Sequence, residues 1–301
     1  MLSVLPDYAG YYTAVLPGGA EYGSGYLAMT VDKNGAVKTT GKLADGTALS
    51  LSGTLIFRNE PACLFTVIYT SPTAYKGAGL FGMAEFVKAE DRDHVFLGTL
   101  DGVPFHWENR NPQATSVYGE GFNRELSLVG GWYDKVGNLS AYYQGKVLSA
   151  SADAGTSAPE LIVGVNRYTS ASWKFSDIAL TPVLKSGAMT GLAVIPKAGL
   201  PVNLGDNSWN YDAENTAALT IGLTRATGIF KGTFKTWFDY GTATHSSKSI
   251  SYEGVLTPDW EATNDFVEGR GFFLWADKAL NPQGKTYPFN WSYDFVLQSG
   301  K

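Results

Sequence analysis

Charged residues are scarce in this sequence, and basic residues are never clustered. Lys, Arg, Asp and Glu make up 17% of the 301 residues, and the net charge is −5. Proteins that bind nucleic acid neutralise its phosphates with grouped Lys and Arg side chains, and this chain has no such group. We therefore expect no nucleic-acid partner. Long charged helices are also disfavoured, because they would raise the Lys and Glu content.

Cysteine is nearly absent. The single residue, Cys63, excludes an internal disulfide and a thiolate metal cluster, and its apolar surroundings at 62–69 predict a buried strand. Phosphate-loop and dinucleotide fingerprints are missing too, since the glycines lie between strands and never open a helix. We expect no cofactor and no metal. A single Ca²⁺ site in the short turns 32–35 or 205–207 is the alternative to plain hairpin turns.

Long apolar runs are missing as well. No segment approaches the roughly 20 apolar residues of a membrane-spanning helix, so we expect no membrane span. An outer-membrane barrel is a third possibility, but its strands need about 9 to 11 residues and an outward apolar band. Several strands predicted here are shorter and carry polar residues on both faces. The 35 Gly, 17 Tyr and low charge are typical of secreted or cell-surface β-proteins, so we expect that location, with the natural leader removed.

Short alternating or apolar segments bounded by turn residues fill the chain and predict antiparallel strands. They lie at 11–16, 25–31, 36–43, 48–57, 63–69, 79–87, 95–100, 104–107, 125–129, 139–143, 160–165, 173–180, 187–195, 217–223, 228–238, 248–256, 269–275 and 287–297. No window keeps a helical period for three turns, and 13 Pro and 35 Gly would break most helices. The fold class is predicted to be all-β.

Two stretches that lie half a chain apart have similar sequences, residues 27–43 and residues 219–235. Residues 178–194 resemble them more weakly. In each, a strand meets a glycine and a second strand follows, which is typical of an all-β architecture built by duplication. Because exposed sheet edges invite aggregation, we expect closure into barrels or packing as sandwiches. The predicted halves are 1–148 and 160–301, either separate or packed as one unit, and 149–159 is the predicted linker.

Glycine and aromatic residues alternate within the second of these stretches. Gly228, Phe230, Gly232 and Phe234 are predicted to share one strand face, because side chains alternate with period two. Alternating small and large residues on one face suit a tapered barrel interior or a tight contact between sheets.

Several glycine and aromatic motifs recur in order along nearly the whole chain. They are G-Y-Y at 10–12, G-K-L-A-D-G-T at 41–47, Y-G-E-G-F at 118–122, G-G-W-Y at 130–133, T-G-I-F-K-G-T-F at 227–234, Y-E-G-V-L at 252–256 and G-R-G-F-F-L at 269–274. Together they resemble a β-rich repeat module found in large secreted or surface proteins of environmental bacteria. The resemblance implies a β scaffold and a surface location. It implies no catalytic residues, since its motifs are structural.

The polar candidates for catalysis are Asp101, His106 and Glu108. On a strand, His106 and Glu108 project to one face and Phe105 and Trp107 to the other. An imidazole beside a carboxylate could act as a general acid–base pair or as two metal ligands. The alternative is a solvated strand face beside a turn. A fourth polar residue, His245, lies in a polar stretch and is predicted to be a surface loop residue.

Aromatic side chains at strand ends or in loops are the candidates for ligand binding, because sugar rings stack on exposed Trp and Tyr faces. They are Trp132, Tyr133, Trp209, Tyr211, Trp237 and Trp260. The alternative is that most of the eight tryptophans are core residues, and Trp173, Trp275 and Trp291 are assigned there because they lie within strand patterns.

Two functions remain open from the sequence. The first is a non-catalytic secreted or cell-surface module for adhesion or carbohydrate contact, with a glycan or cell-surface partner. The second is a glycoside hydrolase with paired carboxylates in a loop-lined cleft, about 5 to 10 Å apart. With 28 acidic residues, plausible pairs arise by chance, so the sequence does not identify one.

Overall fold

The computed structural model confirms the predicted all-β class, with every strand pairing antiparallel. Among the described residues, no helix is long and apolar enough to cross a membrane. The structure describes residues 5–18, 22–88, 95–111, 121–134, 143, 145–153, 161–163, 166–167, 170–172, 175–211, 214–239, 241–257, 267–280 and 286–299. The predictions for Trp173, Trp260 and most of the strand at 139–143 lie outside these residues.

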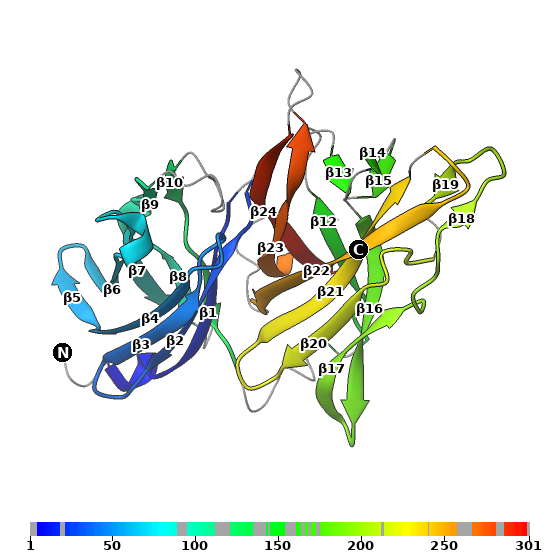
Figure 1. Ribbon diagram of the computed structural model, residues 1–301. Helices are drawn as coiled ribbons and strands as arrows, with labels where there is room; N and C mark the ends of the chain where they lie inside the picture. The colour runs from blue at the N-terminus through cyan, green and yellow to red at the C-terminus, as the bar shows by residue number, and fades with distance from the viewer. Residues whose placement is uncertain are drawn as a thin grey trace.

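The N-terminal half is one curled sheet. Its strands are β1 (Gly10–Leu16), β2 (Gly25–Val31), β3 (Ala36–Lys42), β4 (Ala48–Thr54), β5 (Ile56–Asn59), β6 (Ala62–Thr70), β7 (Leu80–Lys88), β8 (Val95–Thr99), β9 (Phe105–Asn109), β10 (Phe122–Leu126) and β11 (Val129–Trp132). A short 3₁₀ turn, η1 (Leu5–Tyr8), precedes β1, and two more, η2 (Thr73–Tyr75) and η3 (Leu100–Gly102), connect β6 to β7 and β8 to β9. The order is β10-β9-β7-β8-β11-β1-β2-β3-β4, and β6 pairs with β7. The sheet curls into a half-barrel (Figure 1), and strand β4 approaches β6 without ladder pairing, where the Thr66 hydroxyl donates to the Thr54 carbonyl at 3.1 Å.

The C-terminal half is a nearly closed barrel. Its strands are β12 (Leu148–Asp153), β13 (Leu161–Val163), β14 (Asn166–Arg167), β15 (Ser170–Ser172), β16 (Phe175–Lys185), β17 (Ala188–Ile195), β20 (Thr220–Thr224), β21 (Ile229–Asp239), β22 (His245–Leu256), β23 (Val267–Leu280) and β24 (Thr286–Ser299). The main path is β21-β22-β23-β24-β12-β16-β17, and β20 pairs with β21. Since β17 also lies beside β20, the ring almost closes. A separate ribbon pairs β18 (Val202–Asn203) with β19 (Trp209–Asn210).

The predicted linker is wrong over its first five residues. Residues 149–153 belong to β12, which pairs with β16 on one side and with β24 on the other. Their small side chains suggested a flexible segment, but Ala150 and Ala152 are buried in the barrel core, where neighbouring strands leave room only for small residues. The change from one sheet to the other therefore falls earlier, between β11 and β12.

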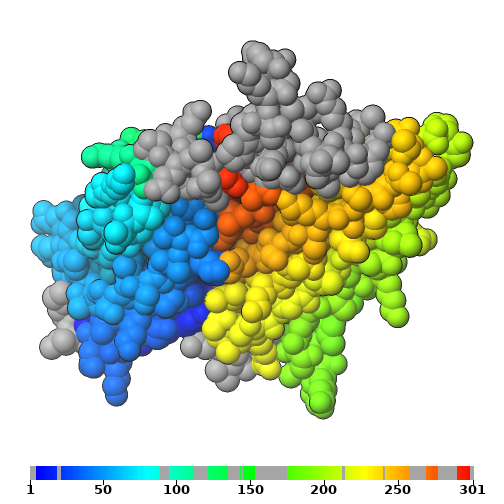
Figure 2. Space-filling view, in the orientation of Figure 1, coloured from blue at the N-terminus to red at the C-terminus, as the bar shows by residue number. Residues whose placement is uncertain are grey.

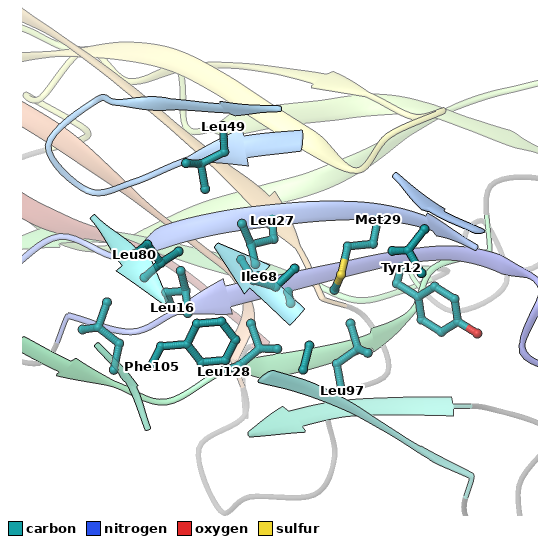
Figure 3. Close-up of a cluster of buried hydrophobic side chains, with 14 of the residues drawn as sticks. Tyr12, Leu16, Leu27, Met29, Leu49, Ile68, Leu80, Leu97, Phe105 and Leu128 are labelled. Carbon is teal, nitrogen blue, oxygen red and sulfur yellow. The ribbon is translucent and has the colours of Figure 1, made fainter. Parts of the chain in front are cut away.

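Each half has its own apolar core. In the N-terminal half, alternate residues of β1, β2 and β6 to β9 point into the curl of the sheet, as the labelled side chains in Figure 3 show. In the C-terminal half, the rings of Tyr252 and Phe295 stack with centroids 3.7 Å apart beside Phe230 and Phe234. A Cβ on Gly232 would collide with the Thr220 carbonyl oxygen, so this glycine allows close strand packing.

The look-alike stretches both form hairpins with four-residue loops, 32–35 and 225–228. Each loop ends on a glycine with positive φ, Gly35 at 83° and Gly228 at 67°, where other residues would be strained. Gly228 therefore lies in a turn. The prediction that it shares a strand face with Phe230 is wrong. The first hairpin lies inside its sheet, whereas β20 borders the gap of the second barrel. Duplication of the halves stays a prediction.

The two halves pack against each other as one unit. Val15 and Tyr26, on the outer faces of β1 and β2, form a buried cluster with Val255 and Phe272, on the outer faces of β22 and β23. In Figure 2 the blue half meets the yellow and orange strands along the middle of the molecule. The predicted alternative of a single packed unit is the arrangement observed.

Hydrogen bonds fix the relative position of the halves. The Thr13 hydroxyl donates to the Leu256 carbonyl at 2.6 Å, and the Gly23 amide donates to the Ser292 carbonyl at 3.2 Å. The Glu253 carboxylate accepts from the Tyr26 hydroxyl at 3.0 Å and pairs with the Lys42 ammonium at 2.5 Å. Partly buried and charge-assisted bonds such as these hold a definite geometry better than apolar contact alone.

Replacing Gly23 tests this interface. A Cβ at this buried position would lie 2.6 Å from Phe272 Cβ and 2.8 Å from the Tyr293 carbonyl oxygen, so the halves must shift. We expect Gly23→Ala to lower the free energy of unfolding in urea by about 1–3 kcal/mol. The control is Gly98→Ala in β8, where a Cβ meets nothing within 4 Å and the stability should stay equal or rise slightly. If Gly23→Ala is as stable as Gly98→Ala, the close packing of the two halves around Gly23 is contradicted.

The same interface contains a carboxyl group with a raised pKa. Asp294, on the outer face of β24, is mostly buried, with 19% of its side chain exposed, and Arg270 Nη1 lies 3.9 Å from its Oδ2. Burial raises the pKa of Asp294 to about 6, against the opposing charge of Arg270. The folded protein therefore binds more protons than the unfolded chain between about pH 4 and pH 6, and this group lowers stability as pH rises through that window.

Replacement of Asp294 by Asn should remove that pH dependence. From about pH 4 to pH 7 the free energy of unfolding of the wild type should fall by about 3 kcal/mol more than that of Asp294→Asn. This difference is the free-energy equivalent of the pKa shift. Urea unfolding at several pH values measures both proteins. Parallel pH profiles for the two would show that Asp294 is not a desolvated carboxyl.

Candidate functional site

The predicted acid–base residues of the N-terminal half do not form a catalytic group. Strand β9 buries Phe105 and Trp107 and exposes His106, which confirms the predicted alternation. Glu108, however, accepts hydrogen bonds from Arg110 at 2.6 and 2.9 Å, and the guanidinium lowers the pKa of its carboxyl.

Asp101 is held in a separate ion pair. Its carboxylate accepts two hydrogen bonds from the guanidinium of Arg58, one of them at 2.7 Å, and this pairing lowers its pKa. A general acid near neutral pH needs a raised pKa, and both carboxyls are shifted the other way. Neither residue lines a described cavity.

Two of the predicted ligand-binding aromatics are buried, so those predictions are wrong. Tyr133 is 1% exposed and its hydroxyl donates to the Arg225 carbonyl at 2.7 Å, which connects the end of the first sheet to the second barrel. Trp237 is 5% exposed and its indole N–H donates to the Thr216 carbonyl at 2.5 Å. Tyr133 directly follows β11 and Trp237 lies within β21, and packing from segments remote in the chain covers both rings, which the sequence pattern does not show.

The other predicted aromatics have different surroundings. Trp132 is half-buried at the end of β11 and packs on the core of the first half, as does Trp291, which touches both cores. Trp275 is buried, as predicted. Trp209 and Tyr211 are half-buried and lie in or beside the β18–β19 ribbon of the second half. Of the predicted aromatics that the structure describes, Tyr211 lines the candidate cavity, and Trp237 touches its edge through Thr216.

A cavity of about 750 Å³ opens at one end of the second barrel. It lies where β12, the start of β16, the end of β17, Tyr211 and residues 214–217 meet, and these strands are labelled in Figure 1. The lining includes the charged, amide and ring-bearing residues Phe175, Asp177, Pro196, Tyr211, Glu214 and Asn215, together with the hydroxyl residues Ser151, Ser176 and Thr216. Two carboxylates, one amide and two aromatic rings thus converge on one concavity.

Three residues of this cavity have left-handed backbones. The φ angles are 58° at Asp177, 47° at Glu214 and 55° at Asn215, a conformation that non-glycine residues rarely adopt. Such residues cluster at ligand sites, where the surrounding structure holds them. The Glu214 carbonyl accepts the Gly199 amide at 3.1 Å and the Asn215 carbonyl accepts the Ala218 amide at 3.0 Å, and both bonds help to hold this segment.

Asn215 supplies an unused hydrogen-bond donor. The residue is 9% exposed, and its Oδ1 accepts the Leu219 amide at 3.3 Å. This bond orients the side chain, and Nδ2 has no hydrogen-bond partner among the described residues. A buried donor without a partner costs about 1–3 kcal/mol, a cost that a ligand oxygen would remove.

Tyr211 supplies a second polar group. Its hydroxyl is also buried without a partner in the described part of the chain. Burial and the nearby Asp239 carboxylate raise the pKa of Tyr211, so the hydroxyl stays neutral and can both donate and accept. Its ring offers a flat face to a bound molecule.

An aromatic cluster adjoins this end of the barrel. His245 opens β22, and its ring centroid lies 3.9 Å from that of Trp209 and 4.9 Å from that of Trp237. Burial lowers the pKa of His245, and Asp239, its cross-strand partner, opposes that shift. The prediction that His245 lies in a surface loop is wrong. It is the first residue of β22, and the pairing of β22 with β21 places its ring against the two indoles. The local polarity of the sequence does not show this pairing.

The remaining sequence candidates are explained by turns and a second cavity. Asp32 Oδ1 accepts the amides of Asn34 and Ala36, as in a plain hairpin turn. Across the described residues, no group of three or more His, Cys, Asp or Glu is arranged to hold a metal. Cys63 is half-buried rather than buried, and it lines a mostly apolar cavity of about 410 Å³ in the first half.

The interaction of His245 with Asp239 can be tested by titration. Because Asp239 raises the pKa of His245 while burial lowers it, we expect Asp239→Asn to lower the His245 pKa further below 6.5. Asn can still accept the Gly241 amide bond that Asp239 Oδ1 makes at 2.8 Å. Imidazole NMR signals measure the shift, and Asp7→Asn in the other half is the control. An unchanged or higher His245 pKa would exclude the coupling.

Comparison of the chain with protein-family models, with curated proteins and with solved structures finds no match in any of the three. The resemblance to a secreted β-rich module therefore stays a prediction. A functional conclusion has to rest on the geometry of the cavity and its neighbours.

Proposed function

We propose that this chain is a non-catalytic secreted or cell-surface β module that binds carbohydrate in the cavity of the second barrel. The volume, about 750 Å³, falls in the range of small-molecule sites, roughly 300–1,000 Å³. The polar groups suit hydroxyl-rich ligands, since carboxylates accept from sugar hydroxyls, Asn215 Nδ2 donates and Tyr211 does both. The composition, poor in charge and rich in Gly and Tyr, supports the surface location.

The observation that carries the proposal is the unpartnered Nδ2 of Asn215. A folded chain rarely keeps a buried donor unsatisfied unless water, an ion or a ligand completes it. The left-handed backbone at this residue adds to the cost of holding the amide there. Both costs are understandable if the amide serves ligand binding.

Binding of neutral oligosaccharides, screened on a glycan array and measured by calorimetry, tests the proposal. We expect Asn215→Asp to weaken binding at least about tenfold, because the donor becomes an acceptor while the shape and the Leu219 hydrogen bond are kept. Asn also tolerates a positive φ better than most residues, and Asp shares this property. Asn123→Asp, on the exposed face of β10, is the matched control and should bind normally. No binding to any glycan would remove the proposal.

A glycoside hydrolase is the second candidate, because Asp177 and Glu214 line the same cavity. The carboxylates first considered, Asp101 and Glu108, are committed to arginines and do not serve. If the chain is a hydrolase, chromogenic glycosides should be turned over, and Asp177→Asn or Glu214→Gln should abolish turnover while glycan binding persists. Absence of turnover across a broad panel would leave binding alone.

A further inference from the structure

We propose that the cavity of the second barrel selects saccharides that carry a free, protonated amine. This inference rests on the proposed carbohydrate binding and adds the ligand's charge to it. It begins from the charges of the lining residues. Asp177 and Glu214 are its only charged members, and no Lys, Arg or His lines the cavity among the described residues.

Neither carboxylate has a counter-charge among the described residues. No ion pair involves Asp177 or Glu214 in the described part of the chain, unlike Asp101 and Glu108 in the other half. Two carboxylates facing one concavity create a negative potential that attracts a cation and repels an acidic ligand. Because both side chains are solvent-exposed at the rim, the effect is moderate and screened by salt.

Two lysines of the described chain lie near the cavity but outside its lining. Lys197 follows Pro196 but is exposed and is not part of the lining. Lys235 lies on the neighbouring strand, and its ammonium is 5.4 Å from the ring centroid of Trp237. The Asp239 carboxylate, whose charge acts on Tyr211, adds to the negative field at the inner side.

The uncharged groups define the rest of the ligand. Asn215 Nδ2 is a donor and needs an acceptor oxygen, which a simple metal cation or an alkyl ammonium ion does not offer. The Tyr211 and Phe175 rings offer apolar faces. A ligand with hydroxyl oxygens, a flat carbon face and an ammonium group uses all of these features, and an amino sugar has them together.

Calorimetry with three oligosaccharides of equal length tests the selection. The probes are glucosamine oligomers, their N-acetylated counterparts and galacturonate oligomers, at about pH 6 and low salt, with 1,5-diaminopentane as a sugar-free amine. We expect the glucosamine oligomers to bind about tenfold more tightly than the N-acetylated ones, because charge-assisted hydrogen bonds are stronger than neutral ones. The galacturonate oligomers should bind least, and added salt should reduce the tenfold difference.

Variants assign the selectivity to the cavity. The double variant Asp177→Asn, Glu214→Gln should bind the two glucosamine-based oligomers equally, and Asn accepts the positive φ at position 177. Glu125→Gln, on the exposed face of β10, removes a charge elsewhere and should keep the tenfold ratio.

Each result separates the two proposals. Equal or tighter binding of the N-acetylated oligomers overturns the amine selectivity and leaves carbohydrate binding standing. Binding of 1,5-diaminopentane alone, with no oligosaccharide bound, overturns both and marks a plain amine site. Retention of the tenfold ratio by the double variant shows that the selectivity arises outside this cavity and overturns the inference.

Discussion

The contact between the outer faces of β1–β2 and β22–β23 is the constraint on which the arrangement of this molecule depends. Val15 and Phe272 belong to strands whose opposite faces already fill the separate cores of the two halves. These strands are therefore covered on both sides, and no sheet face is left open where the halves meet. Polar groups within the contact, Thr13 and Glu253 among them, fix its register, because each must find its partner across the interface.

The candidate site depends on a different property of the second barrel, its incomplete closure. Where β17 lies beside β20 without ladder pairing, the segment that leads into β20 folds over the end of the barrel. The carbonyls of Thr216 and Ala217 accept hydrogen bonds from β21, and this anchoring holds Asn215 in its left-handed conformation. The cavity is thus a consequence of how the chain bridges the gap in the ring.

Carboxylates have different roles in the two halves. In the first half, Asp101 and Glu108 are neutralised by adjacent arginines, so their charge serves local structure. At the interface, burial raises the pKa of Asp294 by more than the nearby charge of Arg270 lowers it. In the cavity, Asp177 and Glu214 have no ion-pair partner among the residues that the structure describes. The amino-acid composition does not distinguish these five carboxylates. Their surroundings in the folded chain give them different charges and partners.

The sequence by itself determined the fold class, most of the strands and the buried alternation of β9, because period-two patterning and turn glycines are local properties of the chain. It did not determine that residues 149–153 form a central strand, since only barrel packing distinguishes buried small residues from flexible ones. Nor did it locate the site: Tyr211 was found from its type, but Asp177, Glu214 and Asn215 were not. The tertiary structure alone decided that convergence, because it depends on distances between strands that are remote in the chain.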